Sequence, residues 1–152
     1  MVHHTGSNSV RDAKPGDAAR LAEIVRLSPE AGRWTESDLE RSIAGSTTRR
    51  CWVAERGGGV AGFLLVEQAA ADETEILTLA VDPAVRRQGV ARDLLTELLR
   101  SGKGRVFLEV RSSNQAAQRL YDRFGFTIAG RRPAYYASPP DDAIIMQRAC
   151  FQ

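Results

Sequence analysis

The chain has 152 residues, 43% of them hydrophobic and 26% charged, with 21 Lys and Arg against 19 Asp and Glu. This length and composition indicate one globular domain, and so balanced a charge gives no reason to expect nucleic acid as a partner. The two cysteines have neither a CxxC spacing nor the pattern of a disulfide framework. His3 and His4 lie next to each other on a polar tail and make a poor metal site, so no metal is expected.

The apolar runs and the start of the chain bear on location. No apolar run approaches the length of a membrane span, and the first ten residues lack the apolar core of a signal peptide. We therefore expect a cytoplasmic protein with no membrane partner. We place its domain at residues 9–149 and a flexible tail at residues 1–8.

The first third of the domain favours a strand and two helices. Residues 9–14 predict a short strand, and Asp17 is placed to cap the first helix. The apolar side of that helix consists of Leu21, Ile24, Val25 and Leu27. After a break at residues 28–32, Thr35 and Asp38 have the spacing of a capping box and predict a second short helix.

Three segments rich in β-forming residues follow, at residues 51–55, 60–68 and 73–81. Glycines 57–59 supply a turn between the first two, and residues 69–72 supply a turn between the second and third. The three segments are therefore predicted to form an antiparallel meander.

The last part of the chain alternates helices and strands. An amphipathic helix begins near residue 90, and residues 105–111 predict a strand that turns Phe107, Glu109 and Arg111 to one face. Asn114 is placed to cap the next helix and Gly125 to end it.

Two further strands are expected at residues 126–130 and 143–147, with a Pro-rich loop between them. The element order is then about βααβββαβαββ. This order predicts an α/β single domain with a central mixed, mostly antiparallel sheet flanked by helices.

The turn between the third meander strand and the following helix carries the clearest chemistry. A helix start offers free backbone N–H groups and a positive dipole end, and small residues at Gly89 and Ala91 let an anion approach closely. Arg86, Arg87 and Arg92 add positive charge, so the turn suits a pyrophosphate. A solvated, Arg-rich helix start is the plain alternative. Neither a Walker loop nor a GxGxxG fingerprint is present.

The segment LEVRSSNQAAQRLYDRFGF at residues 108–126 and the turn VDPAVRRQGVA resemble the GNAT superfamily of N-acetyltransferases. The chain is more closely similar to the RimI type, which acetylates the N-terminal amine of a ribosomal protein. The ending RRPAYYASPPDDAIIMQR and the segment RWTESDL extend the resemblance from about Arg33 to Met146. The combination is specific, although each piece alone is not.

The resemblance implies a GNAT fold and acetyl-CoA as acyl donor, and it assigns roles to residues. Glu109 matches the family's general base, Tyr121 its general acid, and Asn114 a residue that contacts the cofactor. The positions that hold the pantetheine arm and acetyl group are Leu79, Ala80 and Val81. The pyrophosphate loop consists of Arg86, Arg87, Gln88, Gly89, Val90, Ala91 and Arg92.

By the same resemblance the acceptor is a protein N-terminus, a ribosomal protein's N-terminal alanine being first choice. The residues expected to flank it are Trp34, Tyr135 and Tyr136. Three departures from the family pattern stand out. Ala91 replaces a common Gly, Thr78 stands where close relatives often have Asn, and the loop after Tyr136 is short. The last two bear on acceptor choice.

The reaction independently needs these residue types. An N-terminal amine has a pKa near 7.7–8.0, so roughly a tenth of it is neutral at pH 7. A carboxylate takes the remaining proton, a tyrosine hydroxyl supplies one to the departing thiolate, and a strand N–H stabilises the oxyanion. Glu73 and Glu75 are rival bases. Residue type alone favours plainer roles, because a glutamate on a strand usually faces solvent and a tyrosine on the apolar side of a helix, such as Tyr121, usually belongs to the core.

The sequence thus predicts an acetyl-CoA-dependent N-alpha-acetyltransferase. One alternative is a small-molecule amine acetyltransferase on the same fold, which differs in whether the surface near Trp34 and Tyr135 admits a peptide. Another is a non-catalytic acyl-CoA-binding module, which would not need Glu109 and Tyr121.

Overall fold

The computed structural model describes residues 8–151, which form two compact units. The first holds the chain up to Glu67 together with Leu77–Leu98, and the second holds Gln68–Ile76 and the chain from Leu99 onward. Three elements contribute to both units: β3 (Gly59–Ala70), β4 (Glu73–Val81) and α3 (Val90–Ser101). The predicted tail, with His3 and His4, lies outside the described residues except for its last residue, and the domain bounds 9–149 stay a prediction.

The strands of the described residues form a seven-stranded sheet in the order β1-β2-β3-β4-β5-β7-β6. Strands β4 and β5 run parallel, whereas the pairs β1–β2, β2–β3, β5–β7 and β6–β7 run antiparallel. The predicted class, an α/β fold with a mixed and mostly antiparallel sheet, is therefore confirmed.

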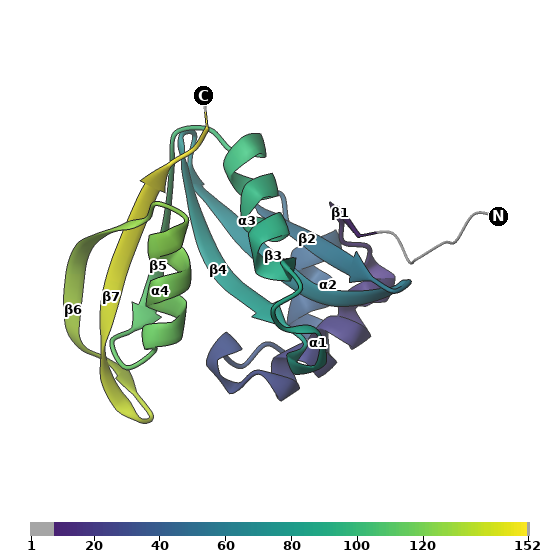
Figure 1. Ribbon diagram of the computed structural model, residues 1–152, viewed down its shortest axis with the longest axis horizontal. Coiled ribbons are helices and arrows are strands. Elements are labelled where there is room, and N and C mark those ends of the chain that lie inside the picture. The colour runs from purple at the N-terminus through teal and green to yellow at the C-terminus, as the bar shows by residue number, and fades with distance from the viewer. Residues whose placement is uncertain (1–7, 152) are drawn as a thin grey trace. The chain divides into compact units, whose positions relative to one another are not determined.

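In the first unit, helices cover both faces of the strands (Figure 1). Its elements are β1 (Ser9–Asp12), η1 (Pro15–Asp17), α1 (Ala18–Leu27), η2 (Pro29–Ala31), α2 (Glu36–Ala44), β2 (Arg49–Arg56), β3 (Gly59–Ala70), η3 (Pro83–Val85) and α3 (Val90–Ser101). Helices α1 and α2 bury their apolar sides against Val53, Phe63 and Leu65 of the strands. On the opposite face α3 starts directly over Gly62, where a Cβ would lie 2.7 Å from Val90.

Two of the predicted helix starts differ in how they are capped. The Thr35 hydroxyl accepts from the Asp38 N–H and the Asp38 carboxylate accepts from the Thr35 N–H, both at 3.0 Å, so the predicted capping box is confirmed. Asp17 stands at the N-cap of α1 but does not cap it, because its carboxylate is taken by Arg11 and the Lys14 N–H. Leu27, predicted on the apolar side, is 48% exposed at the end of α1.

The second unit contains the start of α4 and the β6–β7 hairpin, which carry several of the predicted site residues. Its elements after the first part of β4 are β5 (Arg105–Arg111), α4 (Gln115–Arg123), β6 (Thr127–Ala137) and β7 (Pro140–Ala149). The Asn114 side chain accepts from the Ala117 N–H at 3.1 Å, and Gly125 follows α4 with φ +83°, as predicted.

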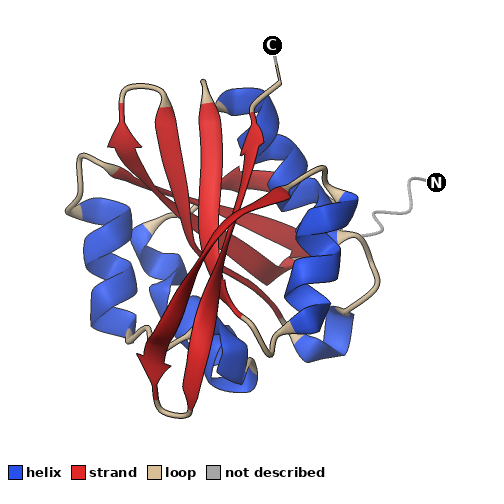
Figure 2. Cartoon of the chain, turned by 90° about the vertical axis from the view of Figure 1, so that its left-hand side faces the viewer, coloured by secondary structure: helices blue, strands red, loops and turns tan. Residues whose placement is uncertain are grey.

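The predicted Pro-rich loop is wrong. Strands β6 and β7 continue through it and form a long twisted hairpin, with a short turn at residues 138–139 (Figure 2). Pro133 is tolerated because β6 is the last strand of the sheet, where a missing N–H costs no ladder bond. The pairing is irregular between Arg132 and Tyr136, where Ala134 has φ +53°.

Candidate active site

In the first unit, the end of β4 is fastened to the connection between α1 and α2. The buried Thr78 hydroxyl donates to the Ala31 carbonyl at 3.0 Å, and Ser28 Oγ donates to the Val81 carbonyl at 3.3 Å. Leu79 and Val81 are half-buried and Ala80 is buried. The residues predicted to hold the acetyl arm therefore sit on a strand end that is held from one side.

The loop after β4 adopts a backbone that most residues avoid. Arg87 has φ +66° and Gly89 has φ +75°. The first helical bond of α3 runs from the Asp93 N–H to the Gly89 carbonyl at 3.0 Å, so the N–H groups of the three residues before Asp93 lie in the unbonded first turn. This geometry, with the positive end of the helix dipole, fits an anionic group.

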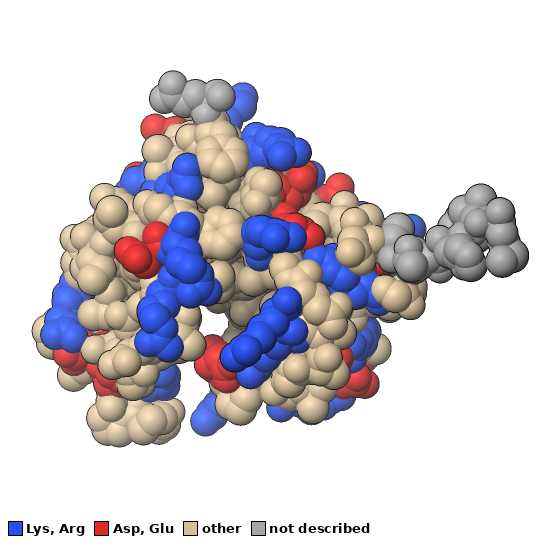
Figure 3. All heavy atoms as spheres, viewed as in Figure 1, with Lys and Arg blue, Asp and Glu red and all other residues tan. Residues whose placement is uncertain are grey.

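Basic side chains surround this helix start (Figure 3). The Arg92 guanidinium lies over Gly89, where a Cβ would be 2.5 Å from Nη2. Arg86 is exposed and pairs with Glu30 at 3.4 Å, and Arg87 is exposed. Positive charge is therefore available to a diphosphate at the loop.

Arg56, at the end of β2, binds both this loop and the first turn of α3. Nothing in the sequence pattern had indicated this role. Its side chain is 5% exposed, and Nη2 donates to the Asp93 carboxylate at 2.6 Å and to the Gln88 carbonyl at 3.3 Å. Nη1 donates to the carbonyl of its neighbour Glu55 at 2.9 Å. One buried guanidinium thus joins a strand, the loop and the first turn of α3.

In the second unit, Glu109 is the carboxylate around which polar and aromatic groups collect. It projects from β5 on the face opposite the buried Leu108 and Val110, and its side chain is 16% exposed. Arg132 Nη2 of β6 lies 3.6 Å from its Oε1. The charge of Glu109, followed by a hydrogen bond to it, raises the pKa of Tyr135.

The aromatic pair of the hairpin stands next to this carboxylate. The Tyr135 and Tyr136 rings meet edge to face with centroids 5.0 Å apart, and the Arg111 guanidinium lies 4.2 Å from the centre of the Tyr136 ring. Burial, followed by the charge of Glu109, raises the pKa of Tyr136. The two tyrosines, expected on a loop, are therefore presented by a strand beside the predicted base.

The comparisons with known proteins decide the family. The model of the acetyltransferase (GNAT) family matches residues 19–126. The chain belongs to the acetyltransferase (GNAT) family. This membership confirms the predicted enzyme class, an acyltransferase that uses acetyl-CoA.

Individual relatives in this family sharpen the likeness. The chain is 36% identical over 138 residues to the N-alpha-acetyltransferase RimI of Mycobacterium tuberculosis, covering 87% of this chain and 86% of that protein. It is 37% identical over 140 residues to an uncharacterised Mycobacterium leprae protein, of whose length it spans 38%. The crystal structure of the ribosomal-protein-S18-alanine N-acetyltransferase from Escherichia coli superposes with a TM-score of 0.84 at 29% identity, covering 96% of both chains.

The two catalytic residues expected from the GNAT resemblance have different surroundings. Tyr121 is 6% exposed on α4, its ring meets Phe126 at 5.3 Å, and burial raises its pKa. Its hydroxyl makes no hydrogen bond to any described residue. The side-chain oxygen of Asn114 accepts the hydrogen bond that caps α4, so the N–H groups of its side-chain amide are left for a ligand. The structure groups Glu109 with the hairpin, and Tyr121 with Phe126.

The rival bases are not equivalent. Glu73 is paired with Arg105 at 2.9 Å, closer than the 3.6 Å between Glu109 and Arg132, which makes Glu73 the poorer candidate. Glu75 faces Phe107 in the β4–β5 register, and its charge adds to the raised pKa of Tyr135. Glu75 therefore lies close enough to the tyrosine pair to remain the rival of Glu109.

Trp34 lies in the first unit, before α2. It packs against the core beneath α1 and α2, and the Arg49 guanidinium lies 5.6 Å from the centre of its ring. Within residues 8–151, no three His, Cys, Asp or Glu side chains are grouped to hold a metal. None of the helices in that range has the length and hydrophobicity needed to cross a bilayer.

Proposed function

We propose that this chain acetylates the N-terminal amine of a protein, with a ribosomal protein bearing an N-terminal alanine as the first candidate. The observation that carries the proposal is the sheltered Glu109 beside the aromatic pair of the β6–β7 hairpin. The 36% sequence identity to the N-alpha-acetyltransferase RimI of Mycobacterium tuberculosis, which extends over 87% of this chain, supports a protein terminus as the acceptor.

The donor site follows from the first unit. The N–H groups at the start of α3 would hold the pyrophosphate, with Arg86, Arg87 and Arg92 neutralising its charge. The backbone at Leu79–Val81 would hold the pantetheine arm and polarise the thioester carbonyl. By the family resemblance, Asn114 stays a candidate cofactor contact through the N–H groups of its side-chain amide.

The proposed proton transfers balance within the reaction. The amine nitrogen bonds to the thioester carbon, the carbon–sulfur bond breaks, and Glu109 accepts the proton that the attacking amine loses. Tyr121 keeps its proton at neutral pH, as any tyrosine with a pKa near 10 does, and burial raises its pKa further. Its hydroxyl therefore acts first as a hydrogen-bond donor to the departing thiolate, and its proton moves only as sulfur takes up negative charge.

The test compares two peptides. One has a free N-terminal alanine and no lysine, and its partner has a blocked N-terminus and one lysine. We expect the free N-terminus to be acetylated faster, because a lysine amine with a pKa near 10.4 is neutral a few hundredfold less often at pH 7. Equal or faster acetylation of the blocked peptide would reject the N-terminal assignment. Acetylation of small amines alone would favour the small-molecule alternative.

A further inference from the structure

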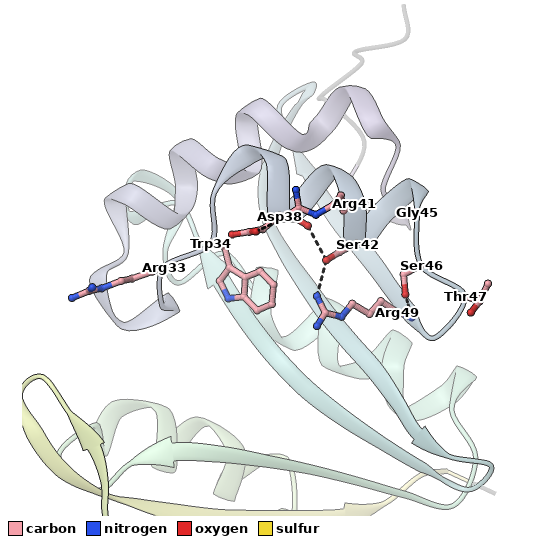
Figure 4. A pocket seen from close by; sticks show the side chains of 9 residues that line it. All are labelled: Arg33, Trp34, Asp38, Arg41, Ser42, Gly45, Ser46, Thr47 and Arg49. Atoms are coloured by element: carbon pink, nitrogen blue, oxygen red, sulfur yellow. Dashed lines mark hydrogen bonds and ion pairs between the residues drawn. The ribbon is translucent and has the colours of Figure 1, made fainter.

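A basic pocket lies in the first unit between the start of α2 and the start of β2, with a volume of about 650 Å³ (Figure 4). We call it the arginine pocket. Its lining residues are Arg33, Trp34, Asp38, Arg41, Ser42, Gly45, Ser46, Thr47 and Arg49. No residue of β4 lines it, so it is separate from the strand end assigned to the acetyl arm.

The pocket carries excess positive charge. Three arginines line it against one carboxylate, that of Asp38. That carboxylate is already occupied, because Oδ2 accepts from the Thr35 N–H at 3.0 Å and Oδ1 accepts from Arg41 at 2.7 Å. The Thr35 N–H also lowers the pKa of Asp38, so the group stays ionised and committed to its cap. The charge of Arg49 also acts on Asp38, but the Asp38 oxygens bond to Thr35 and Arg41, so Asp38 and Arg49 form no ion pair.

Arg49 is fixed in the middle of the pocket before any ligand arrives. Its Nη1 donates to Ser42 Oγ at 3.0 Å, and Ser42 is 2% exposed and donates in turn to the Asp38 carbonyl at 2.9 Å. Nε lies 3.5 Å from Glu67, which is not a lining residue. Its remaining nitrogen, Nη2, has no partner among the described residues. A preoriented guanidinium with an open N–H edge suits a carboxylate.

The rest of the pocket favours a side chain over a bare ion. Figure 4 shows the Trp34 ring and Arg49 next to each other inside the pocket, whereas Arg33 points away from them at its rim. The Trp34 ring offers an apolar wall for methylene groups, and Arg41, on α2, is 69% exposed and pairs with Asp38. An acidic side chain combines both needs, a carboxylate for Arg49 and methylenes for Trp34.

We infer that the arginine pocket binds an Asp or Glu side chain of the acceptor polypeptide. The inference rests on the proposed function and on the family resemblance, by which Trp34 is expected to flank the acceptor. Because no residue of β4 lines the pocket, the acidic residue is not the one that is acetylated. It follows the acetylated residue along the acceptor, and the pocket selects termini with acidic residues nearby.

The transfer experiment uses peptides with one free N-terminal alanine and a single Glu placed in turn at positions two to six, each with a Gln counterpart. At one position at least, the Glu peptide should have a roughly two- to fivefold higher kcat/KM, the size expected for one partly exposed ionic contact, and the gain should lie in KM. Added salt should reduce it. A Glu-to-Gln ratio of one or less at every position overturns the inference.

Variants locate the effect. Arg49→Gln and Arg41→Gln should each bring the ratio toward one, and the exposed Arg41 keeps the test usable if Arg49→Gln folds poorly. Arg26→Gln is the matched control, since Arg26 is an exposed arginine of α1 outside the pocket. A Glu preference that survives in both pocket variants also overturns the inference.

A binding experiment separates this inference from the proposed function. Fluorescently labelled, N-acetylated versions of the best Glu peptide and its Gln counterpart are titrated with the protein, and anisotropy reports binding without transfer. Tighter binding of the Glu peptide with no acetylation of any free terminus would support the pocket and reject the proposed function. Equal binding of the two peptides with normal acetylation would reject the pocket and support the proposed function.

Discussion

The loop at residues 86–89 and the β6–β7 hairpin differ in what holds them and in what they present. The loop presents backbone N–H groups, and the buried Arg56 holds it from below. The hairpin presents side chains, and Arg132 and Tyr135 are 55% and 49% exposed on the last strand of the sheet. A backbone site keeps its ligand while most side chains change. A side-chain site can change its ligand without disturbing strand pairing.

The strongest way to break the backbone site is Gly89→Glu. The φ of +75° strains any side chain, and the carboxylate repels a pyrophosphate, so acetyl-CoA affinity should fall roughly thousandfold. Calorimetric titration measures the loss. Gly89→Gln keeps the strain without the charge and should lose much less. Unchanged affinity in Gly89→Glu would remove the loop from the donor site.

In the hairpin site, the largest effect is expected from Glu109→Gln. Loss of the base should lower kcat roughly hundredfold while acetyl-CoA affinity stays the same, because Glu109 lies outside the backbone site. The deficit should shrink as pH rises and more of the amine is already neutral. Glu75→Gln is the control, and if it is the slower of the two variants, Glu75 is the base.

Tyr121→Phe should lower kcat roughly thirtyfold by removing one hydrogen-bond donor to the thiolate. The ring keeps its contact with Phe126, and the hydroxyl has no partner among the described residues, so the melting temperature should not fall. Steady-state kinetics and thermal unfolding measure the two effects. A kcat equal to that of the parent protein would exclude Tyr121 as the acid.

Arg56→Met tests whether the backbone site depends on its support. The KM for acetyl-CoA should rise roughly tenfold with a smaller change in kcat, and the free energy of unfolding should fall by about 2 kcal/mol as the partly buried ion pair with Asp93 is lost. Chemical denaturation and kinetics measure these changes. Arg26→Met replaces an exposed arginine of α1 and should change neither. A lower stability with unchanged KM would make Arg56 purely structural.

The smallest effect concerns Tyr135. Because the charge of Glu109 raises its pKa, Glu109→Gln should move that pKa down toward the ordinary value near 10. Ultraviolet titration of the protein, with Tyr135→Phe as the subtraction control, gives the pKa. A value that does not move would mean that the two groups are not in contact in solution.

The strand, loop and helix start at residues 79–92 were predicted better than the hairpin for a physical reason. The strand end, the small residues and the helix start at residues 79–92 are neighbours in sequence, so local pattern and family resemblance describe them together. Arg56 was missed because its partner Asp93 is 37 positions away, and an arginine at a strand end looks like a solvated side chain. Only the strand pairing brings the two together.

The hairpin was predicted as a loop because Pro133, Pro139 and Pro140 suggest irregular backbone. Proline opposes strand structure only where its N–H is needed, and the outermost strand does not need it. Asp17 shows the same limit at a smaller scale. Its position suited a helix cap, but Arg11 on the neighbouring strand binds its carboxylate instead.

The irregular stretch of β6 also limits how far another strand could pair with this edge of the sheet. An outermost strand offers a row of free N–H and C=O groups that another chain can extend. Pro133 contributes no N–H, and Ala134 at φ +53° turns its own N–H inward to the Asp142 carboxylate at 2.8 Å. The row of free backbone groups is therefore interrupted in the middle of the hairpin, and a foreign strand could not pair with β6 along its full length.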